Sequence, residues 1–216
     1  MKIKLLIFDF DGTLGDSKNL IVKTMQETIK EIGRAVPSEE SCASTIGLPL
    51  KKCFSSLLGE DEELIGKCAE LYELFFKKNN MPGAVPPFDG VIQTIEELHK
   101  KGIKMAIASN RGHRSLAAFV EEMQLGEMIT VVLGADDVEQ QKPNAEPALK
   151  ILAHYGCQPN ECMIIGDAQF DILMGKNARI QTCGVTYGNG TREELEEAGA
   201  DYIIEHLSEL KRILFK

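Results

Sequence analysis

The stretch KLLIFDFDGTL, residues 4–14, decides the fold of this chain and points to its chemistry. An apolar run of strand length ends in two carboxylates, Asp9 and Asp11, which lead into a Gly-Thr turn. Acids at the end of a buried strand repel each other and lose their hydration. The usual compensation is a bound cation, a covalent step on one carboxylate, or both. We therefore expect a functional site where this strand ends.

The composition is that of a soluble globular protein with room for one core and a second small domain. The chain has 216 residues, of which 44% are hydrophobic and 26% are charged. The chain has no apolar run that approaches the ~20 residues needed to span a bilayer. The apolar N-terminal stretch leads directly to acids rather than to a signal-peptide cleavage site. We expect a cytoplasmic location and no membrane partner.

Charge and cysteine content narrow the possible partners. The net charge of -9 argues against nucleic acid, because binding its backbone requires clustered Lys and Arg. It would also repel an anionic substrate, so local cations must hold such a substrate at the site. The six cysteines form no Cys-x-x-Cys pair and show no metal-ligand spacing with the four histidines. They are expected to be reduced thiols that pack as small apolar groups.

Strands and helices alternate over the second part of the chain. The predicted strands are 104–109, 130–134, 162–166, 181–185 and 202–204. The predicted helices between them are 90–101, 115–123, 146–155 and 171–178. This alternation predicts an α/β fold with a parallel sheet covered on both faces.

The segment after the first strand does not follow this alternation. Helical patterns cover 17–32 and 60–78, and the turn Gly47-Leu48-Pro49 interrupts a further helical stretch. The breaker-rich segment 79–87 is the best candidate for a linker. We expect an inserted, all-helical cap domain over residues 16–81, and a core domain made of residues 1–15 and 82–216.

Polar side chains follow the carboxyl ends of the predicted strands. In chain order they are Asp9 and Asp11, then Ser109, Asn110 and Arg111, then Lys142, and finally Asp167 and Asp171. In open parallel sheets, ligands bind outside the carboxyl ends of strands. Each pattern alone also fits a turn or a helix cap. Their succession at consecutive strand ends predicts an active site.

These residue types suit phosphoryl transfer. Asp9 can attack phosphorus and form an acyl phosphate, which splits one difficult displacement into two easier ones. Asp11 can protonate the leaving oxygen and then take a proton from the water that cleaves the intermediate. A like-charged neighbour and partial burial raise the pKa of one carboxyl enough to hold that proton. The proton belongs to a coupled pair of carboxyls.

Magnesium is the expected cation, because it prefers a few carboxylates together with water and substrate phosphate. Asp9, Asp167 and Asp171 are its expected side-chain ligands, and Asp11 is expected to offer its backbone carbonyl. The transferring oxygens need donors that stabilise charge spread over the phosphoryl group. The expected donors are Lys142, the Ser109 hydroxyl, Arg111, and backbone N–H groups near Gly12 and at Asn110.

On these motifs the chain resembles the haloacid dehalogenase superfamily of phosphatases. DFDGTL at 9–14 matches the first motif, Ser109 the second, Lys142 the third, and GDAQFD at 166–171 the fourth. The resemblance implies a Rossmann-like core, an inserted helical cap, an aspartyl-phosphate intermediate and Mg²⁺. The branch that it most resembles is the phosphoglycolate phosphatase-like one. The stretches behind that assignment are DS at 16–17, TIGLPL at 45–50, GVTYG at 184–188 and ADYI at 200–203.

Asp11 separates the chemistries within this superfamily. Dehalogenases of the family lack this second acid, because a carbon–halogen bond needs no proton on its leaving group. The resemblance therefore favours a Mg²⁺-dependent phosphatase acting on a small phosphomonoester, similar to phosphoglycolate, in a monomer or small homo-oligomer. The enzyme alternatives are a pyrophosphatase or nucleotidase and a sugar-phosphate mutase similar to β-phosphoglucomutase. The non-enzyme alternative is a phosphate-binding regulator without turnover.

The cap is expected to set specificity by closing over the site and excluding water. Lys51 and Lys52 are its candidates for contact with a substrate anion, and a solvated first helical turn is the alternative. Two positions depart from the family pattern. Gly15 stands where a larger apolar residue is usual, which would loosen the hinge or fit a local turn. Ala168 lacks the hydroxyl that the family usually has beside the metal.

Overall fold

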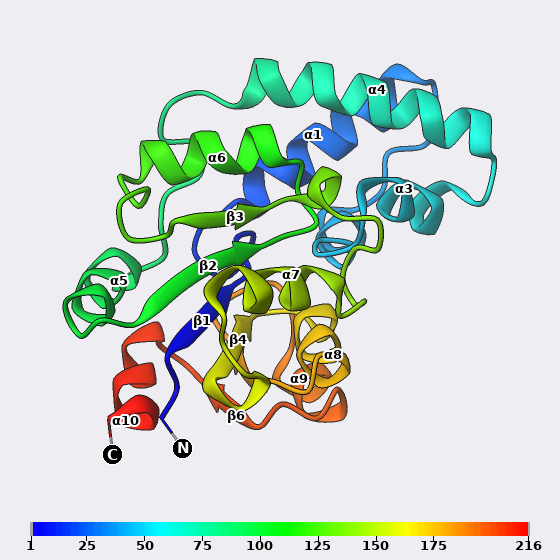
Figure 1. Ribbon diagram of the computed structural model, residues 1–216. Coiled ribbons are helices and arrows are strands. Elements are labelled where there is room, and N and C mark those ends of the chain that lie inside the picture. The colour runs from blue at the N-terminus through cyan, green and yellow to red at the C-terminus, as the bar shows by residue number, and fades with distance from the viewer. Residues whose placement is uncertain (1, 216) are drawn as a thin grey trace.

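The computed structural model describes residues 2–215 and contains a parallel six-stranded sheet (Figure 1). Its strands are β1 (Leu5–Phe8), β2 (Lys104–Ala108), β3 (Val131–Leu133), β4 (Cys162–Gly166), β5 (Gln181–Val185) and β6 (Tyr202–Ile204). They are ordered β3-β2-β1-β4-β5-β6 across the sheet. All five pairings are parallel, which confirms the predicted α/β, Rossmann-like class.

The decisive stretch of the sequence forms the centre of this sheet. All four residues of β1 are buried. The strand pairs with β2 on one side, where Leu5 lies opposite Lys104, and with β4 on the other, where Leu5 lies opposite Cys162. A parallel strand covered on both faces has a continuous apolar sequence rather than an alternating one. The run before Asp9 is apolar for this reason.

The helices follow the predicted arrangement, with a helical block after β1 and alternation with strands from residue 91 onward. They are α1 (Lys18–Glu31), α2 (Glu39–Ala43), α3 (Leu50–Leu58), α4 (Glu62–Asn79), α5 (Val91–Lys100), α6 (His113–Glu122), α7 (Glu146–Tyr155), α8 (Gln169–Asn177), α9 (Arg192–Glu197) and α10 (Leu210–Leu214). The sequence did not predict α9 and α10, because helices of six and five residues hold too few turns to show a period. Within residues 2–215, no helix combines the length and apolar character that crossing a membrane requires.

Alternate residues of β1 serve two apolar cores. Leu5 and Ile7 lie in a cluster with side chains of α7 and α8. Leu6 and Phe8 lie in a larger cluster that includes α5, α6 and the helices α1 to α4. Successive side chains of a strand point to opposite faces, so each face of the sheet has its own layer of helices. All six cysteines are buried and free, as the sequence predicts.

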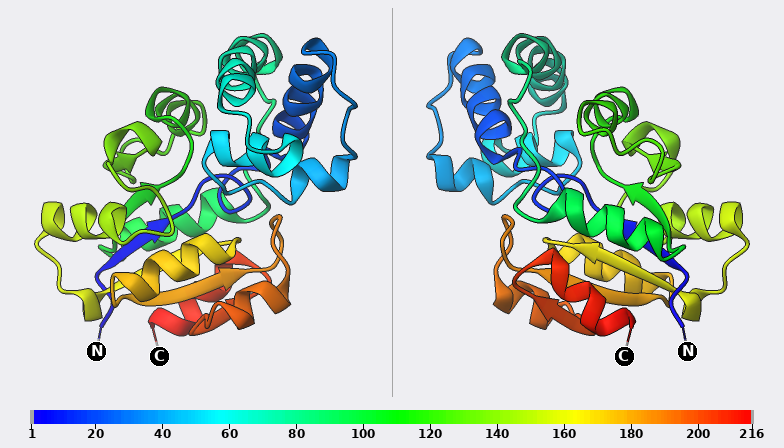
Figure 2. Two further views of the ribbon diagram at one scale, coloured as in Figure 1. Left: turned by 90° about the vertical axis from the view of Figure 1, so that its right-hand side faces the viewer. Right: turned by 90° about the vertical axis from the view of Figure 1, so that its left-hand side faces the viewer.

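Four helices leave the sheet after β1 and group together beyond the carboxyl ends of the strands (Figure 2). We call α1 to α4 the cap helices. They pack on one another through buried side chains such as Met25, Phe54 and Tyr72. The chain then returns to the sheet through α5. The cap helices fall within residues 16–81, and the domain boundaries themselves stay a prediction.

Close packing accounts for Gly15, which stands between β1 and the first cap helix. Its backbone forms isolated bridges with Asp11 and Pro87. A Cβ at this position would lie 2.8 Å from Cγ1 of Val85 and 2.9 Å from the ring of Phe10. A larger side chain would therefore displace the core beneath it, so the structure favours the local fit over hinge freedom as the reason for Gly15.

Candidate active site

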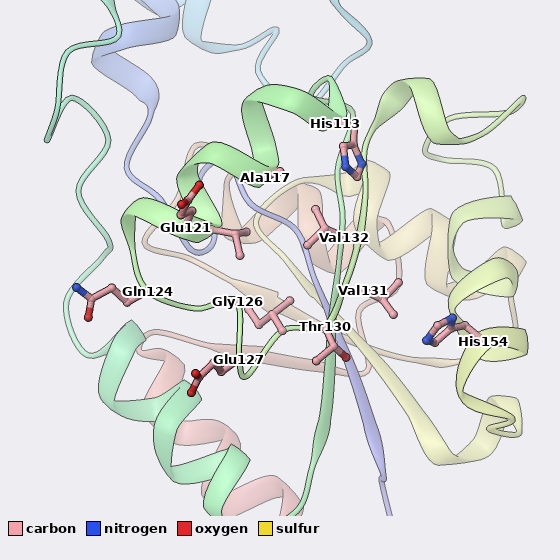
Figure 3. A pocket seen from close by; sticks show the side chains of 12 residues that line it. His113, Ala117, Glu121, Gln124, Gly126, Glu127, Thr130, Val131, Val132 and His154 are labelled. Carbon is pink, nitrogen blue, oxygen red and sulfur yellow. The ribbon is translucent and has the colours of Figure 1, made fainter.

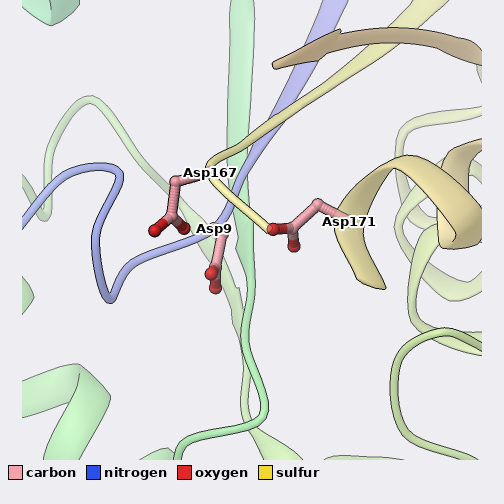
Figure 4. A group of neighbouring side chains, drawn as sticks. All are labelled: Asp9, Asp167 and Asp171. Carbon is pink, nitrogen blue, oxygen red and sulfur yellow. The ribbon is translucent and has the colours of Figure 1, made fainter. Parts of the chain in front are cut away.

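Three acids meet where the central strands end. Asp9 follows β1, Asp167 follows β4, and Asp171 lies in the first turn of α8 (Figure 4). One carboxylate oxygen of each lies within 4.8 Å of the others, and all three residues are buried. We call these three residues the carboxylate cluster. Three segments that are far apart in the sequence thus place their acids together, as the strand-end rule predicts.

Lys142 is the buried cation of this cluster. It comes from the loop between β3 and α7, and its ammonium lies 2.7 Å from Oδ1 of Asp9 and 2.7 Å from Oδ1 of Asp171. Only 1% of its side chain is exposed. Three carboxylates therefore face one ammonium, and the cluster carries excess negative charge when all three acids are ionised.

Burial and mutual repulsion act on the pKa values of these groups. Burial raises the pKa of Asp9 well above its usual range, against the attraction of Lys142, and Asp171 and Asp167 raise it further. Burial and the charge of Asp171 raise the pKa of Asp167 to about 7. Burial works to lower the pKa of Lys142, but Asp171 and Asp9 outweigh it and hold that pKa above its usual value. Ionising all three acids without a further cation is therefore unfavourable.

The cluster fits a divalent cation. Its donors are hard oxygens, which suit Mg²⁺, and they are buried at one point with excess negative charge. Oδ1 of Asp9 is buried and close to the Lys142 ammonium, at 2.7 Å. Asp9, Asp167 and Asp171 would hold the ion. A bound Mg²⁺ would offset the excess charge and allow an anionic phosphoryl group to approach an anionic nucleophile.

Asp167 is held in place from two sides. The Thr13 hydroxyl donates to its Oδ1 at 3.3 Å, and the N–H of Asn189 donates to its Oδ2 at 2.7 Å. Gly12 has φ +83°, and a Cβ there would lie 2.0 Å from Oδ2 of Asp167. Position 12 therefore requires glycine for both its backbone conformation and its contact with Asp167. The Gly12 N–H, predicted to hold phosphate, instead donates to the Gly15 carbonyl at 3.0 Å.

The side chain of Asp11 belongs to a separate arrangement. Arg111 donates two hydrogen bonds to it, from Nε at 2.9 Å and from Nη2 at 2.6 Å, and the Ser17 hydroxyl adds a third at 2.5 Å. The guanidinium lies over the rings of Phe76 and Phe119, 4.8 Å and 5.2 Å from their centroids. We call this arrangement the Asp11–Arg111 pair. Arg111 is thus engaged by Asp11 in this structure, and its contact with phosphate stays a prediction.

Asn110 connects three parts of the site. Its Nδ2 donates to the carbonyl of Gly47 in the cap at 2.8 Å and to the carbonyl of Lys142 at 3.3 Å. Its Oδ1 accepts the N–H of Lys142 at 3.1 Å. Ser109 is buried, and its Oγ accepts the N–H of Arg111 at 3.3 Å. The side chain of Asn110 therefore positions the Lys142 loop and a cap turn, and contact of Ser109 with phosphate stays a prediction.

A cavity of about 550 Å³ opens beside Asp9, between the strand ends and the cap helices. Asp9, Asp11, Ser109, Arg111 and Lys142 all line it. Lys51 and Lys52, the predicted anion contacts of the cap, are exposed on α3 and are not part of its lining. The cavity therefore brings the candidate catalytic groups to a space that a substrate can enter.

A second hollow lies beside the edge strand β3 (Figure 3). Its volume is about 900 Å³, and its lining includes His113 and His154. Apart from these histidines, it is lined mainly by backbone turns and side chains of α6 and β3. None of the strand-end acids or Lys142 reaches it. The smaller cavity is therefore the candidate active site.

Sequence reasoning missed some of the residues that support the site. Asn189 follows β5 and contacts Asp167, so the strand-end rule would have found it had it been applied to this strand. Thr13 lies within the first motif and Ser17 follows it, and their hydroxyls donate hydrogen bonds to Asp167 and Asp11. The stacking of Phe76 on Arg111 has no signal in the sequence, because it joins a cap helix to a core loop.

Comparison with known proteins agrees with this site. Residues 6–185 match the model of the family described as haloacid dehalogenase-like hydrolase. A protein named pyrophosphatase PpaX from Anoxybacillus flavithermus is 31% identical over 99% of this chain and 98% of its own length. "Probable phosphatase IndB" from Dickeya dadantii is 31% identical over 95% of this chain and 91% of its own. The chain belongs to the haloacid dehalogenase-like hydrolase family, as its motifs predict.

Solved structures share the fold over the whole chain. A crystal structure described as "a predicted phosphatase from Clostridium acetobutylicum" matches with a TM-score of 0.90 at 26% identity, covering 99% of each chain. Another, described as "a predicted phosphoglycolate phosphatase" from Haemophilus somnus, matches with a TM-score of 0.87 over 99% of this chain and 98% of its own. Its identity is 21%, so that likeness concerns the fold alone.

Proposed function

We propose that this protein is a Mg²⁺-dependent phosphatase that hydrolyses a small phosphomonoester through a phosphorylated Asp9. The observation that carries the proposal is the carboxylate cluster around Lys142, whose Asp9 and Lys142 line a cavity. When its three acids are ionised, the cluster carries excess negative charge, which a divalent cation would compensate while also attracting a phosphoryl group. Asp9 lies next to Lys142, so a nucleophile and a donor for phosphoryl oxygens face the same space.

The chain's own groups divide the reaction as follows. An Asp9 oxygen bonds to phosphorus as the bond to the leaving alcohol oxygen breaks, and Asp11 gives that oxygen its proton. Water then attacks the phosphorus, Asp11 takes its proton, and phosphate leaves as Asp9 is restored. Lys142 stabilises the charge on the transferring oxygens. Because Arg111 holds Asp11, the acid must turn out of that pair to reach the leaving oxygen.

The test is turnover of p-nitrophenyl phosphate with Mg²⁺ and with a chelator. We expect turnover that depends on Mg²⁺ and is lost in Asp9→Asn. Folded protein that shows no turnover with Mg²⁺, or an undiminished rate in Asp9→Asn, would refute the proposal. Circular dichroism of both proteins provides the folding control.

Pyrophosphate hydrolysis is the second candidate, because the name of a full-length relative at 31% identity specifies that activity. The same cluster could act on a phosphoanhydride, since Asp9 attacks phosphorus in both reactions. Comparing kcat/KM for pyrophosphate with kcat/KM for phosphomonoesters decides between the two. A value for pyrophosphate that exceeds those for all phosphomonoesters tested would move the assignment.

A further inference from the structure

The cap contributes a group of apolar side chains to the lining of the cavity. These are Ile21 and Met25 of α1, Ile46 of the turn after α2, Leu50 and Cys53 of α3, and Tyr72 of α4. All except Leu50 are buried. We call these six residues the apolar wall. The leaving part of a substrate bound at Asp9 would lie against this wall.

The buried cations of the cavity already have partners. Lys142 contacts Asp9 and Asp171, and Arg111 gives two hydrogen bonds to Asp11. Besides these, the charged residues that line the described cavity are exposed and of both signs. They are Glu73 and Asp136, which are acidic, and Lys77 and Arg114, which are basic. No buried, unpaired cation among the described lining residues faces the apolar wall.

This distribution of charge favours one kind of leaving group. An anion pressed against the apolar wall would lose its hydration without gaining a partner, which is unfavourable. An apolar group in the same place would gain from leaving water, in proportion to the surface it buries. The wall therefore discriminates between two phosphate compounds that bind Asp9 and Lys142 equally well.

The size of the cavity points the same way. A volume of about 550 Å³ lies in the range of sites that enclose organic ligands of considerable size. Pyrophosphate and 2-phosphoglycolate are much smaller and would leave most of this space to water. Among the described lining residues, the cations without an ion-pair partner, Lys77 and Arg114, are exposed, so a second anionic group would meet them only where water competes for it.

We propose that the substrate is a phosphomonoester whose leaving alcohol carries an uncharged, apolar chain or ring, and that the apolar wall selects it. The inference rests on the proposed phosphatase function and narrows it. It replaces the phosphoglycolate-like substrate expected from the sequence with a larger and less charged one. A second anionic group on the leaving part lowers kcat/KM.

A ladder of alkyl phosphates from methyl to hexyl tests the proposal with Mg²⁺ present. Primary alcohols are similar leaving groups, so differences in kcat/KM report contact with the wall. We expect a rise of at least about tenfold along the ladder. A chain as long as the hexyl one but ending in a carboxylate should fall at least about tenfold below hexyl phosphate, and pyrophosphate and 2-phosphoglycolate should fall below it too. A flat ladder, or anionic compounds that equal or exceed hexyl phosphate, would overturn the inference.

A charge placed on the wall gives a second test. Leu50→Lys adds a cation to the lining, whereas Leu74→Lys adds the same cation on α4, where Leu74 is 62% exposed and lies outside the lining. We expect Leu50→Lys to reduce the preference for hexyl over the carboxylate-tipped chain by about tenfold, and Leu74→Lys to leave it unchanged. An unchanged preference in both variants would contradict selection by the wall. If Leu50→Lys does not fold, Leu50→Gln should flatten the alkyl ladder.

The two proposals fail in different ways. Mg²⁺-dependent turnover combined with a preference for anionic compounds would overturn only the inference about the wall. Absence of Mg²⁺-dependent phosphate release from every compound would overturn the phosphatase function and the inference with it.

Discussion

Asp9 and Asp11 stand two residues apart, yet they belong to opposite electrostatic arrangements. Asp9 joins two further carboxylates around one ammonium, so its surroundings carry excess negative charge. Asp11 faces one guanidinium in a one-to-one pair, covered by two aromatic rings. Both sites are largely buried, and so the difference between them lies in charge balance rather than in exposure.

This difference supports the proposed roles of the two acids. A buried cluster with excess charge needs a cation from outside, which suits a metal-bound nucleophile. A balanced pair needs none, and its acid can leave the pair, accept a proton and return. We therefore expect substitutions in the carboxylate cluster to change the dependence of activity on Mg²⁺. We expect substitution of Asp11 to change the dependence of activity on the leaving group.

Removing the nucleophile should have the largest effect. We expect Asp9→Asn to lower kcat by at least about 10⁴-fold, because no other group of the site replaces an attacking carboxylate. Asp136→Asn, at the mouth of the same cavity, is the matched control and should retain activity. Steady-state kinetics on alkyl phosphates measures both. A loss of kcat below about tenfold in Asp9→Asn would contradict the proposal that Asp9 is the nucleophile.

Removing the proton carrier should have an effect that depends on the leaving group. We expect Asp11→Asn to lower kcat on alkyl phosphates by about 10²–10⁴-fold, a range typical of general acid–base catalysis. The loss on p-nitrophenyl phosphate should be much smaller, because nitrophenolate leaves without a proton. The Mg²⁺ concentration for half-maximal activity should not change. Equal losses on both substrates would show that Asp11 is not the proton donor.

The two buried cations should differ in their response to metal. Lys142→Met and Arg111→Met each leave buried acid without its partner, and each should lower the free energy of unfolding by about 3–5 kcal/mol. Saturating Mg²⁺ should restore part of the loss in Lys142→Met but not in Arg111→Met, because the proposed Mg²⁺ site is the carboxylate cluster. Urea unfolding with and without Mg²⁺ measures this. Equal recovery in both variants would contradict two separate sites.

The stability of the metal-free protein should depend on pH through Asp167. Burial raises its pKa from 3.8 to about 7, so the folded state holds a proton that the unfolded chain has lost. The stabilisation is complete below pH 3.8 and is lost as pH rises through about 7, by up to roughly 4 kcal/mol. The free energy of unfolding of the wild type, relative to that of Asp167→Asn, should therefore decrease as the pH rises from about 4 to about 7. Saturating Mg²⁺ should weaken the dependence.

Asp201 provides a control of opposite sign. Burial works to raise its pKa, but bonds from Lys176 and Thr182 outweigh it and lower that pKa. Its contribution to stability is present above pH 3.8 and is lost as pH falls through the lowered value. Asp201→Asn should therefore lower the free energy of unfolding above about pH 3.8. It should not change the pH dependence that Asp167 contributes. The prediction for Asp167 would be contradicted if the free energy of unfolding of the wild type, relative to that of Asp167→Asn, increased between pH 4 and pH 7.

Local pattern was enough to predict the fold and the acids of the site. The apolar run of β1 and the strand–helix alternation specify a parallel sheet, and a parallel sheet brings its carboxyl ends together. Asp9, Asp167 and Asp171 therefore meet although more than 150 residues separate the first two. The family match covers residues 6–185, which include these three acids.

The sequence could not predict the contacts between cap and core residues. Asp11 and Arg111 are 100 positions apart, and their pairing depends on the orientation of a loop beside Phe76 of α4. Spacing along the chain does not specify such an orientation. For the same reason Lys51 appeared as an anion contact, whereas its neighbour Leu50 lines the cavity. Which residue of a cap helix faces the site depends on tertiary packing.

Trapping of the phosphorylated acid tests the central claim most directly. Protein quenched in acid during turnover with Mg²⁺ is treated with borohydride, which reduces an aspartyl phosphate to homoserine, and the peptide that carries positions 9 and 11 is sequenced by mass spectrometry. We predict homoserine at position 9, an unmodified Asp11, and no homoserine in Asp9→Asn. Homoserine at position 11, or rapid phosphate release with neither position modified, would contradict the assignment of Asp9 as nucleophile.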